Sequence, residues 1–152
     1  MNKRELIPLT IDLVNMINVR HGDEYAPFFF RALLNEKENN DYIAYATINN
    51  DEKVLALGAV YRILPGVGEA FMTFSKDEMV SPYSPNTRWL YKAIEYKLHE
   101  SFIKLNLHRI QAYVKFDSEK DSRFIERLGF HLEGLLQQFW DNNDYYIYGK
   151  VI

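Results

Sequence analysis

The sequence predicts one domain of the α/β (α+β) class, and three patterns carry that prediction. Residues 107–134 read as a strand, a short helix and a second strand. Residues 42–74 read as an antiparallel meander of strands, and residues 85–105 as a long helix with one apolar stripe. Sheets and amphipathic helices bury their apolar faces against each other, so these elements are expected to form layers around one core.

Length and composition agree with a single domain that spans residues 1–152. Hydrophobic residues make up 47% and charged residues 26% of the chain, which is the balance of an ordinary globular protein. No segment is long and apolar enough to span a membrane, and the N-terminus lacks the apolar core of a signal peptide. A cytoplasmic (intracellular) protein is therefore expected.

Charge and cysteine content argue against several functions. The net charge of -3 disfavours a nucleic-acid-binding protein, because such proteins hold phosphates with an excess of Lys and Arg. The chain has no cysteine, which excludes disulfides, thiolate metal sites and cysteine nucleophiles. No metal site is expected either, because metal-ligand spacing is missing from the histidines, which are His21, His99, His108 and His131.

Two short helices are expected before the meander. Thr10 and Asp12 begin an apolar run that is typical of a first helix. Residues 25–34 read as a second helix, and the polar run at 36–41 reads as a loop.

The meander is expected to have three strands joined by two turns. Residues 42–48 and 54–64 form the first two strands, and the turn between them has a composition suited to left-handed backbone. Residues 65–68, Pro-Gly-Val-Gly, form the second turn, and residues 69–74 form the third strand.

The long helix has a clear start signal. Ser84 reads as its N-cap and Pro85 as its first residue. The apolar residues that follow at helical spacing are Leu90, Ala93, Ile94, Leu98, Phe102 and Leu105. This stripe is expected to pack on the sheet.

The last third of the chain begins with a half-buried strand whose apolar positions are Ile110, Ala112 and Val114. Ser118 can cap the next helix, and Gly129 can adopt the left-handed conformation that ends it. The apolar stripe of that helix consists of Phe124, Ile125 and Leu128. Phe130 then starts another strand, so the first and last strands of this unit could share one sheet.

This region resembles the GCN5-related N-acetyltransferases (GNAT), in particular the branch that acetylates protein N-terminal amines. The matching residues are His108-Arg109-Ile110, Arg123, Glu126-Arg127-Leu128-Gly129-Phe130, Glu133-Gly134 and the aromatic ending DYYIYGK at 144–150. The resemblance implies the GNAT fold, a central mixed, mostly antiparallel sheet of about six to seven strands flanked by about four helices. It also implies acetyl-CoA as the cofactor if the protein is active.

The family's cofactor loop is not matched. In active relatives a Q/R-x-x-G-x-G/A motif precedes the long helix, and its backbone N–H groups hold the cofactor diphosphate. Here the motif falls on residues 85–90, where Pro85, Arg88 and Leu90 occupy its three positions. No glycine lies between Gly68 and Gly129. Weak or absent binding of acetyl-CoA is therefore expected.

The candidate catalytic residues are Glu69 and Glu78. A carboxylate whose pKa is raised by partial burial can act as a general base toward an amine. The alternative for both is a solvated surface charge. Ile125 occupies the helix position at which many relatives carry a proton-donating Tyr.

Four residues are candidates for cofactor binding. The main chain around Phe71 and Thr73 could polarise the acyl carbonyl. Arg88 could pair with a phosphate, and Ser118 replaces the Asn that usually opens the fourth helix of the family.

A second resemblance is to small GNAT-like proteins of tailed bacteriophages, related to the internal virion protein A of short-tailed phages. It rests on FMTFSKDEM at residues 71–79, an aromatic strand that runs into an acidic bend. The helix at 88–104 follows without a glycine loop. This resemblance implies a role in virion assembly or another protein contact, without acetyl transfer.

Two functions therefore remain. The favoured one is a GNAT-fold protein with a degenerate acetyl-CoA loop, non-catalytic or weakly active, that acts through a protein partner or as a homo-oligomer. Such a protein would be virion-associated if phage-encoded. The alternative is an active acyl-CoA-dependent N-acetyltransferase for a small amine or a protein N-terminus. Cross-strand packing or a protein contact would each explain the C-terminal aromatic residues, which are Phe139, Trp140, Tyr146 and Tyr148.

Overall fold

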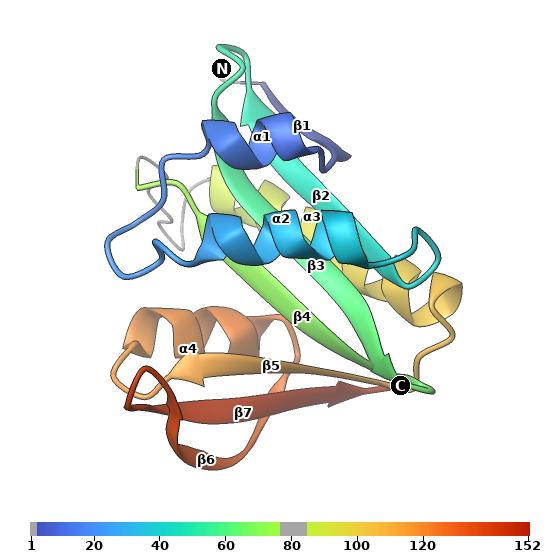
Figure 1. Cartoon of the computed structure of the whole chain (residues 1–152), viewed down its shortest axis with the longest axis vertical. Helices are drawn as coiled ribbons and strands as arrows, with labels where there is room; N and C mark the ends of the chain where they lie inside the picture. Colours follow the sequence, from blue (N-terminus) through green and yellow to red (C-terminus); the bar gives the residue numbers. More distant parts are fainter. Residues whose placement is uncertain (1–2, 77–84) are drawn as a thin grey trace.

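Seven strands form one sheet in the computed structural model, which describes residues 3–76 and 85–152. Their order is β1-β2-β3-β4-β5-β7-β6 (Figure 1). The strands are β1 (Arg4–Pro8), β2 (Tyr42–Asn49), β3 (Val54–Leu64), β4 (Val67–Phe74), β5 (Arg109–Lys115), β6 (His131–Trp140) and β7 (Asn143–Val151). Every neighbouring pair is antiparallel except β4 and β5, so the sheet is mixed and mostly antiparallel, as predicted.

Four helices flank the sheet in the described part of the chain, as predicted. They are α1 (Ile11–Met16), α2 (Ala26–Glu36), α3 (Pro85–Lys104) and α4 (Glu119–Arg127). Helices α1 and α2 cross one face of the sheet, and α3 lies behind it (Figure 1). None of these helices is long and apolar enough to cross a membrane.

Apolar cores on both faces hold the helices to the sheet. On the first face Val14 of α1 and Phe30 of α2 pack on Leu57 of β3. On the opposite face α3 and α4 share one core with β5 and β7, in which Phe102 and Ile110 are almost fully buried. The predicted stripe of α3 therefore faces the sheet.

Helix ends show where local signals succeed and fail. Thr10 caps α1 from an extended backbone (ψ 162°), and its hydroxyl accepts a hydrogen bond of 3.3 Å from the Leu13 amide. Gly129 follows α4 with a φ of 88°, as predicted. Ser118 occupies the N-cap position of α4, as predicted, but its ψ is 81° and its side chain makes no capping hydrogen bond.

Some element boundaries also differ from prediction. The third strand of the meander begins at Val67, because Val67 and Gly68 already pair with β3, and only Pro65-Gly66 is left for the turn. Strand β1 was not predicted. Its apolar stretch is too short to give a local signal, and pairing with β2 stabilises it as a strand. Helix α3 begins at Pro85 as predicted, and the proposed Ser84 cap lies outside the described residues.

The junction between β4 and β5 shapes the centre of the sheet. The two strands pair in parallel over three positions that end at Glu69 and Gln111, and beyond them the strands diverge. Gly68 allows the close approach, since a Cβ there would lie 2.7 Å from Leu107 Cδ1 and 3.2 Å from the Tyr61 carbonyl oxygen. The result is a wedge that opens between β4 and β5 toward α4.

Candidate functional site

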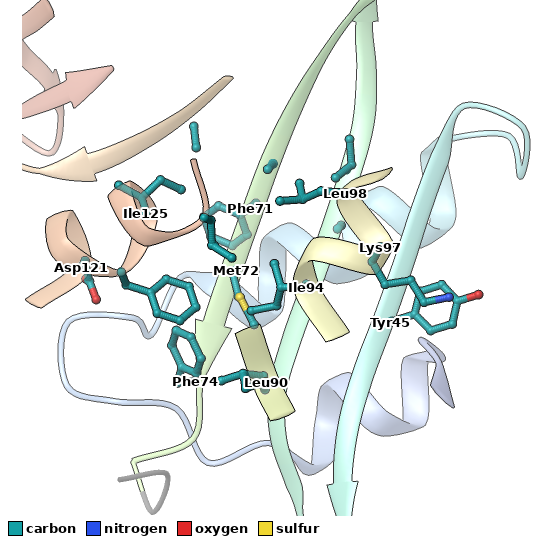
Figure 2. Close-up of a pocket in the computed structure, with 18 of the residues that line it drawn as sticks. Tyr45, Phe71, Met72, Phe74, Leu90, Ile94, Lys97, Leu98, Asp121 and Ile125 are labelled. Carbon is teal, nitrogen blue, oxygen red and sulfur yellow. The ribbon is translucent and has the colours of Figure 1, made fainter. Parts of the chain in front are cut away.

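A cavity of about 200 Å³ enters the wedge between β4 and β5. Phe71 and Met72 of β4 line it, with Ile125 of α4 beside them (Figure 2). Tyr113 of β5 lines it as well. Among the described residues no strand pairs with the β5-facing edge of β4 at residues 70–74. An extended ligand could therefore hydrogen-bond to this edge as an added strand would.

Glu69 lies at the vertex of the wedge and is half-buried. Its Oε2 accepts a hydrogen bond of 2.6 Å from the Tyr61 hydroxyl. Its Oε1 accepts one of 2.6 Å from the Tyr113 hydroxyl and one of 3.1 Å from Gln111 Nε2. A carboxylate can accept about four hydrogen bonds, so these contacts leave room for a donor from a ligand.

The two phenols keep their protons over a wide pH range. Burial raises the pKa of Tyr113 to about 12, and its hydrogen bond to Glu69 adds to the shift. Burial and the same carboxylate raise the pKa of Tyr61 as well. At neutral pH both hydroxyls are donors, so they orient Glu69 and compensate for its partial burial.

Aromatic side chains surround Glu69 on the face that carries α2. One series of ring contacts runs from Tyr61 to Trp140, with centroids 4.4 to 6.0 Å apart. A second contact joins Tyr113 to Phe139 at 4.7 Å, and Phe139 is the chain neighbour of Trp140. We call these seven residues the aromatic wall: Tyr25, Phe29, Tyr61, Phe71, Tyr113, Phe139 and Trp140.

A charged network ties the α1–α2 loop to the open end of the wedge. Arg20 contacts Asp23 at 3.1 Å and, across the wedge, Asp121 of α4 at 3.3 Å. Asp23 also accepts a 2.9 Å hydrogen bond from the Thr73 hydroxyl. The Lys76 amide donates to the Asn18 carbonyl oxygen at 2.8 Å, so the loop also pairs with the chain just after β4.

The predicted site residues are only partly brought together. Glu69, Phe71 and Thr73 share one side of β4, where Phe71 lines the cavity and Thr73 is fully buried. Arg88 is exposed on α3, and Ser118 is half-buried before α4; neither lines the cavity. Glu78 lies outside the described residues.

Sequence reasoning missed the partners of Glu69. Gln111 and Tyr113 occupy the polar side of their strand, and that alternation was the only signal that they point away from the core. Tyr61 lies on a different strand, and its pairing with Glu69 in the β3–β4 ladder depends on the register of the meander. Arg20 and Asp23 sit in a loop without any motif.

No protein-family model matches the sequence, and the search of curated proteins found no match. Solved structures do match over nearly the whole chain. Ribosomal-protein-S5-alanine acetyltransferase from Vibrio fischeri is 14% identical, with 99% of this chain and 96% of that chain covered and a TM-score of 0.71. Spermidine/spermine N-acetyltransferase SpeG from Vibrio cholerae is 19% identical, with 98% and 92% covered and a TM-score of 0.68.

A structure described as that of a proposed phosphinothricin N-acetyltransferase is 10% identical, with 99% of both chains covered and a TM-score of 0.76. At such identities the likeness shows the fold alone. The chain has the GNAT acetyltransferase fold that its C-terminal residues predicted.

Proposed function

We propose that this protein is an acyl-CoA-dependent N-acyltransferase that acts on an amine, either a small molecule or a protein N-terminus. The observation that supports this function best is the wedge between β4 and β5, with the Glu69 carboxylate at its vertex. An unpaired strand edge for the donor and a carboxylate for the amine meet at one point.

The residues of the chain have distinct roles in this proposal. Glu69 accepts an N–H of the incoming ammonium group and then its proton, while Tyr61 and Tyr113 hold the carboxylate in place. The aromatic wall attracts the cation through its ring faces. Main-chain N–H groups of β4 near Phe71 and Thr73 stabilise the charge that develops on the acyl oxygen.

In this proposal the pantetheine arm of the donor lies in the wedge. This arm is an extended chain with amide groups, and the edge of β4 at residues 70–74 offers matching main-chain partners. Bound acyl-CoA would supply an activated thioester, whose C–S bond is exchanged for a C–N bond. Glu69 takes the first proton from the ammonium nitrogen, and the second proton that this nitrogen loses ends on the released thiol. We propose Arg88 and Ser118 as further contacts to the donor.

A second candidate is a GNAT-fold protein that works through protein contacts without acyl transfer. The absence of glycine between Gly68 and Gly129 favours it, as does Pro85 at the start of α3, which has no N–H to offer a phosphate. Strand β6 forms an edge of the sheet, and it carries four exposed apolar side chains. They are Leu132, Leu135, Phe139 and Trp140. Such an edge suits a protein partner or a second copy of the chain.

Calorimetric titration with coenzyme A and acetyl-CoA tests the proposed function. Binding in the micromolar range, followed by thiol release in the presence of amines, is the expected result. If neither ligand binds at about 1 mM, the affinity is too weak for a donor site. The acyltransferase is then rejected in favour of the second candidate. Concentration-dependent sedimentation that is lost on replacing Leu135 with Lys would then support a role in protein contacts.

A further inference from the structure

The cavity continues beyond the wedge, beneath α3. Figure 2 shows Ile94 and Leu98 of α3 over the sheet, with Met72 on the β4 side and Tyr45 at the opposite end. The same cavity is thus lined by α4, β4, α3 and β2. The part beneath α3, which we call the inner cavity, lies on the sheet face opposite the aromatic wall. The wedge connects the inner cavity to the face that carries the wall.

Small side chains make the floor of this inner part. Ala56 and Gly58 of β3 and Ala70 of β4 line it, although strand interiors usually favour larger residues. A Cβ added to Gly58 would meet only Met72 Cγ, at 3.9 Å, which is ordinary van der Waals contact. A side chain could therefore begin at Gly58 without a clash, beside the cavity that this glycine lines.

The polar groups around the inner cavity offer little to water. The Ser101 hydroxyl donates to the Lys97 carbonyl oxygen at 2.6 Å, and the Lys97 ammonium group is bound by Glu100 and lies 3.5 Å from the Tyr45 ring centroid. The buried Thr47 hydroxyl lacks a hydrogen-bond partner among the described residues. A buried water needs two to four polar partners, so one hydroxyl does not make this a hydrated site.

We propose that this inner cavity binds an apolar chain. The cavity as a whole, wedge included, measures about 200 Å³. A dry cavity of about 150 Å³ already holds benzene, so a chain of about six to eight carbon atoms fits the whole cavity. In the proposed acyltransferase, on which this part of the inference rests, the chain is the acyl group of the donor. The cavity begins at the wedge, where the thioester would lie, and leads away from the aromatic wall. The donor is then a medium-chain acyl thioester, with acetyl-CoA as a weaker ligand.

Titration of the full-length protein with n-octanol tests the cavity without any thioester. We expect saturable binding below about 1 mM, since each buried methylene strengthens binding severalfold. Gly58→Leu should fill the space and weaken octanol binding at least about tenfold. Gly134→Leu is the matched control. It is also a strand glycine with ordinary room, 3.7 Å from Ile147 Cγ2, but it lies outside the cavity.

A second variant that fills the cavity keeps the test informative if Gly58→Leu does not fold. Ala93→Leu places a larger side chain in the same cavity from α3. Either variant is used only if its circular-dichroism spectrum is that of a folded protein. Failure of octanol to bind the wild-type protein would overturn the proposal. Equal binding by the filled variants and the Gly134→Leu control would do the same.

Acyl-CoA esters separate this inference from the proposed function. Octanoyl-CoA should bind the wild-type protein at least about thirtyfold more tightly than acetyl-CoA, and Gly58→Leu should bring the two affinities together. Equal binding of both esters by the wild-type protein would overturn the medium-chain donor and leave the transferase intact. If neither ester binds while octanol does, the transferase fails and the apolar site remains.

Discussion

The carboxylate of Glu69 on β4 is held by side chains that two other strands supply. Tyr61 comes from β3, and Gln111 and Tyr113 come from β5. On a solvated strand this glutamate would be an ordinary surface charge. Its carboxylate is instead half-buried and hydrogen-bonded at the vertex of the wedge, which is where the proposed function needs a base for the amine.

We predict that Glu69→Gln lowers the rate of acyl transfer at least about 100-fold, because the amide cannot take a proton from the amine. The protein should stay folded, since the amide oxygen still accepts a hydrogen bond from one phenol and the amide NH2 can donate to the hydroxyl oxygen of the other. Thiol release under saturating donor measures the effect. Glu95→Gln, on the exposed side of α3, is the control and should retain wild-type activity. A Glu69→Gln variant as active as this control would contradict the assignment.

The raised pKa of Tyr113 leads us to predict that the free energy of unfolding falls at high pH. Its pKa is raised to about 12 in the folded protein, mainly by burial and also by Glu69. A raised pKa favours the protonated folded state, so this stabilisation is complete below the unfolded value of about 10 and is lost as pH approaches 12. Urea unfolding of the wild-type protein and Tyr113→Phe across this range should show a steeper decline for wild type. Parallel curves would refute the raised pKa.

At the scale of elements, the two N-cap positions offer a direct comparison. Thr10 makes a capping hydrogen bond to α1, whereas Ser118 makes none to α4. Thr10→Ala should lower the free energy of unfolding by about 1 kcal/mol, and Ser118→Ala should change it by only about 0.3 kcal/mol or less. Chemical denaturation measures both. A larger effect at Ser118 would mean that α4 is capped in solution after all.

At the scale of the whole molecule, the wedge depends on contacts between distant segments. Arg20 joins the α1–α2 loop to α4, whose Asp121 is about a hundred positions further along the chain. The same loop pairs with the main chain after β4. The open end of the wedge is thus defined by two loops and a helix that no local pattern relates.

We predict that Arg20→Gln loosens this closure. Hydrogen exchange at the Lys76 amide, which is bonded to Asn18, should accelerate at least about tenfold, because the loop loses its ion pairs to Asp23 and Asp121. Arg123→Gln removes the exposed ion pair with Glu119 on α4 and serves as the control. Unchanged protection at Lys76 would show that the main-chain pairing alone holds the loop.

Most of the elements were predictable because their signals are local. Alternating apolar and polar residues indicated β5. Pro85 and the apolar stripe indicated α3, and Gly129 indicated the end of α4. Short β1 was not predictable, because an edge strand of five residues is stabilised by its partner and not by its own sequence. For the candidate site, residue type and strand position suggested Glu69, Phe71 and Thr73 as candidates, but they gave no sign of the groups that hydrogen-bond to Glu69.

By itself the sequence determined the fold, since period-two and helical periodicity select strands and helices and the C-terminal motif selects their arrangement. It also determined that no glycine loop precedes α3. Only the tertiary structure decided that β4 and β5 part after Glu69, that aromatic side chains from distant parts of the chain pack together, and that a cavity runs beneath α3. The physical reason is that strand register and side-chain packing between distant segments set these features, and neither is encoded in a local pattern.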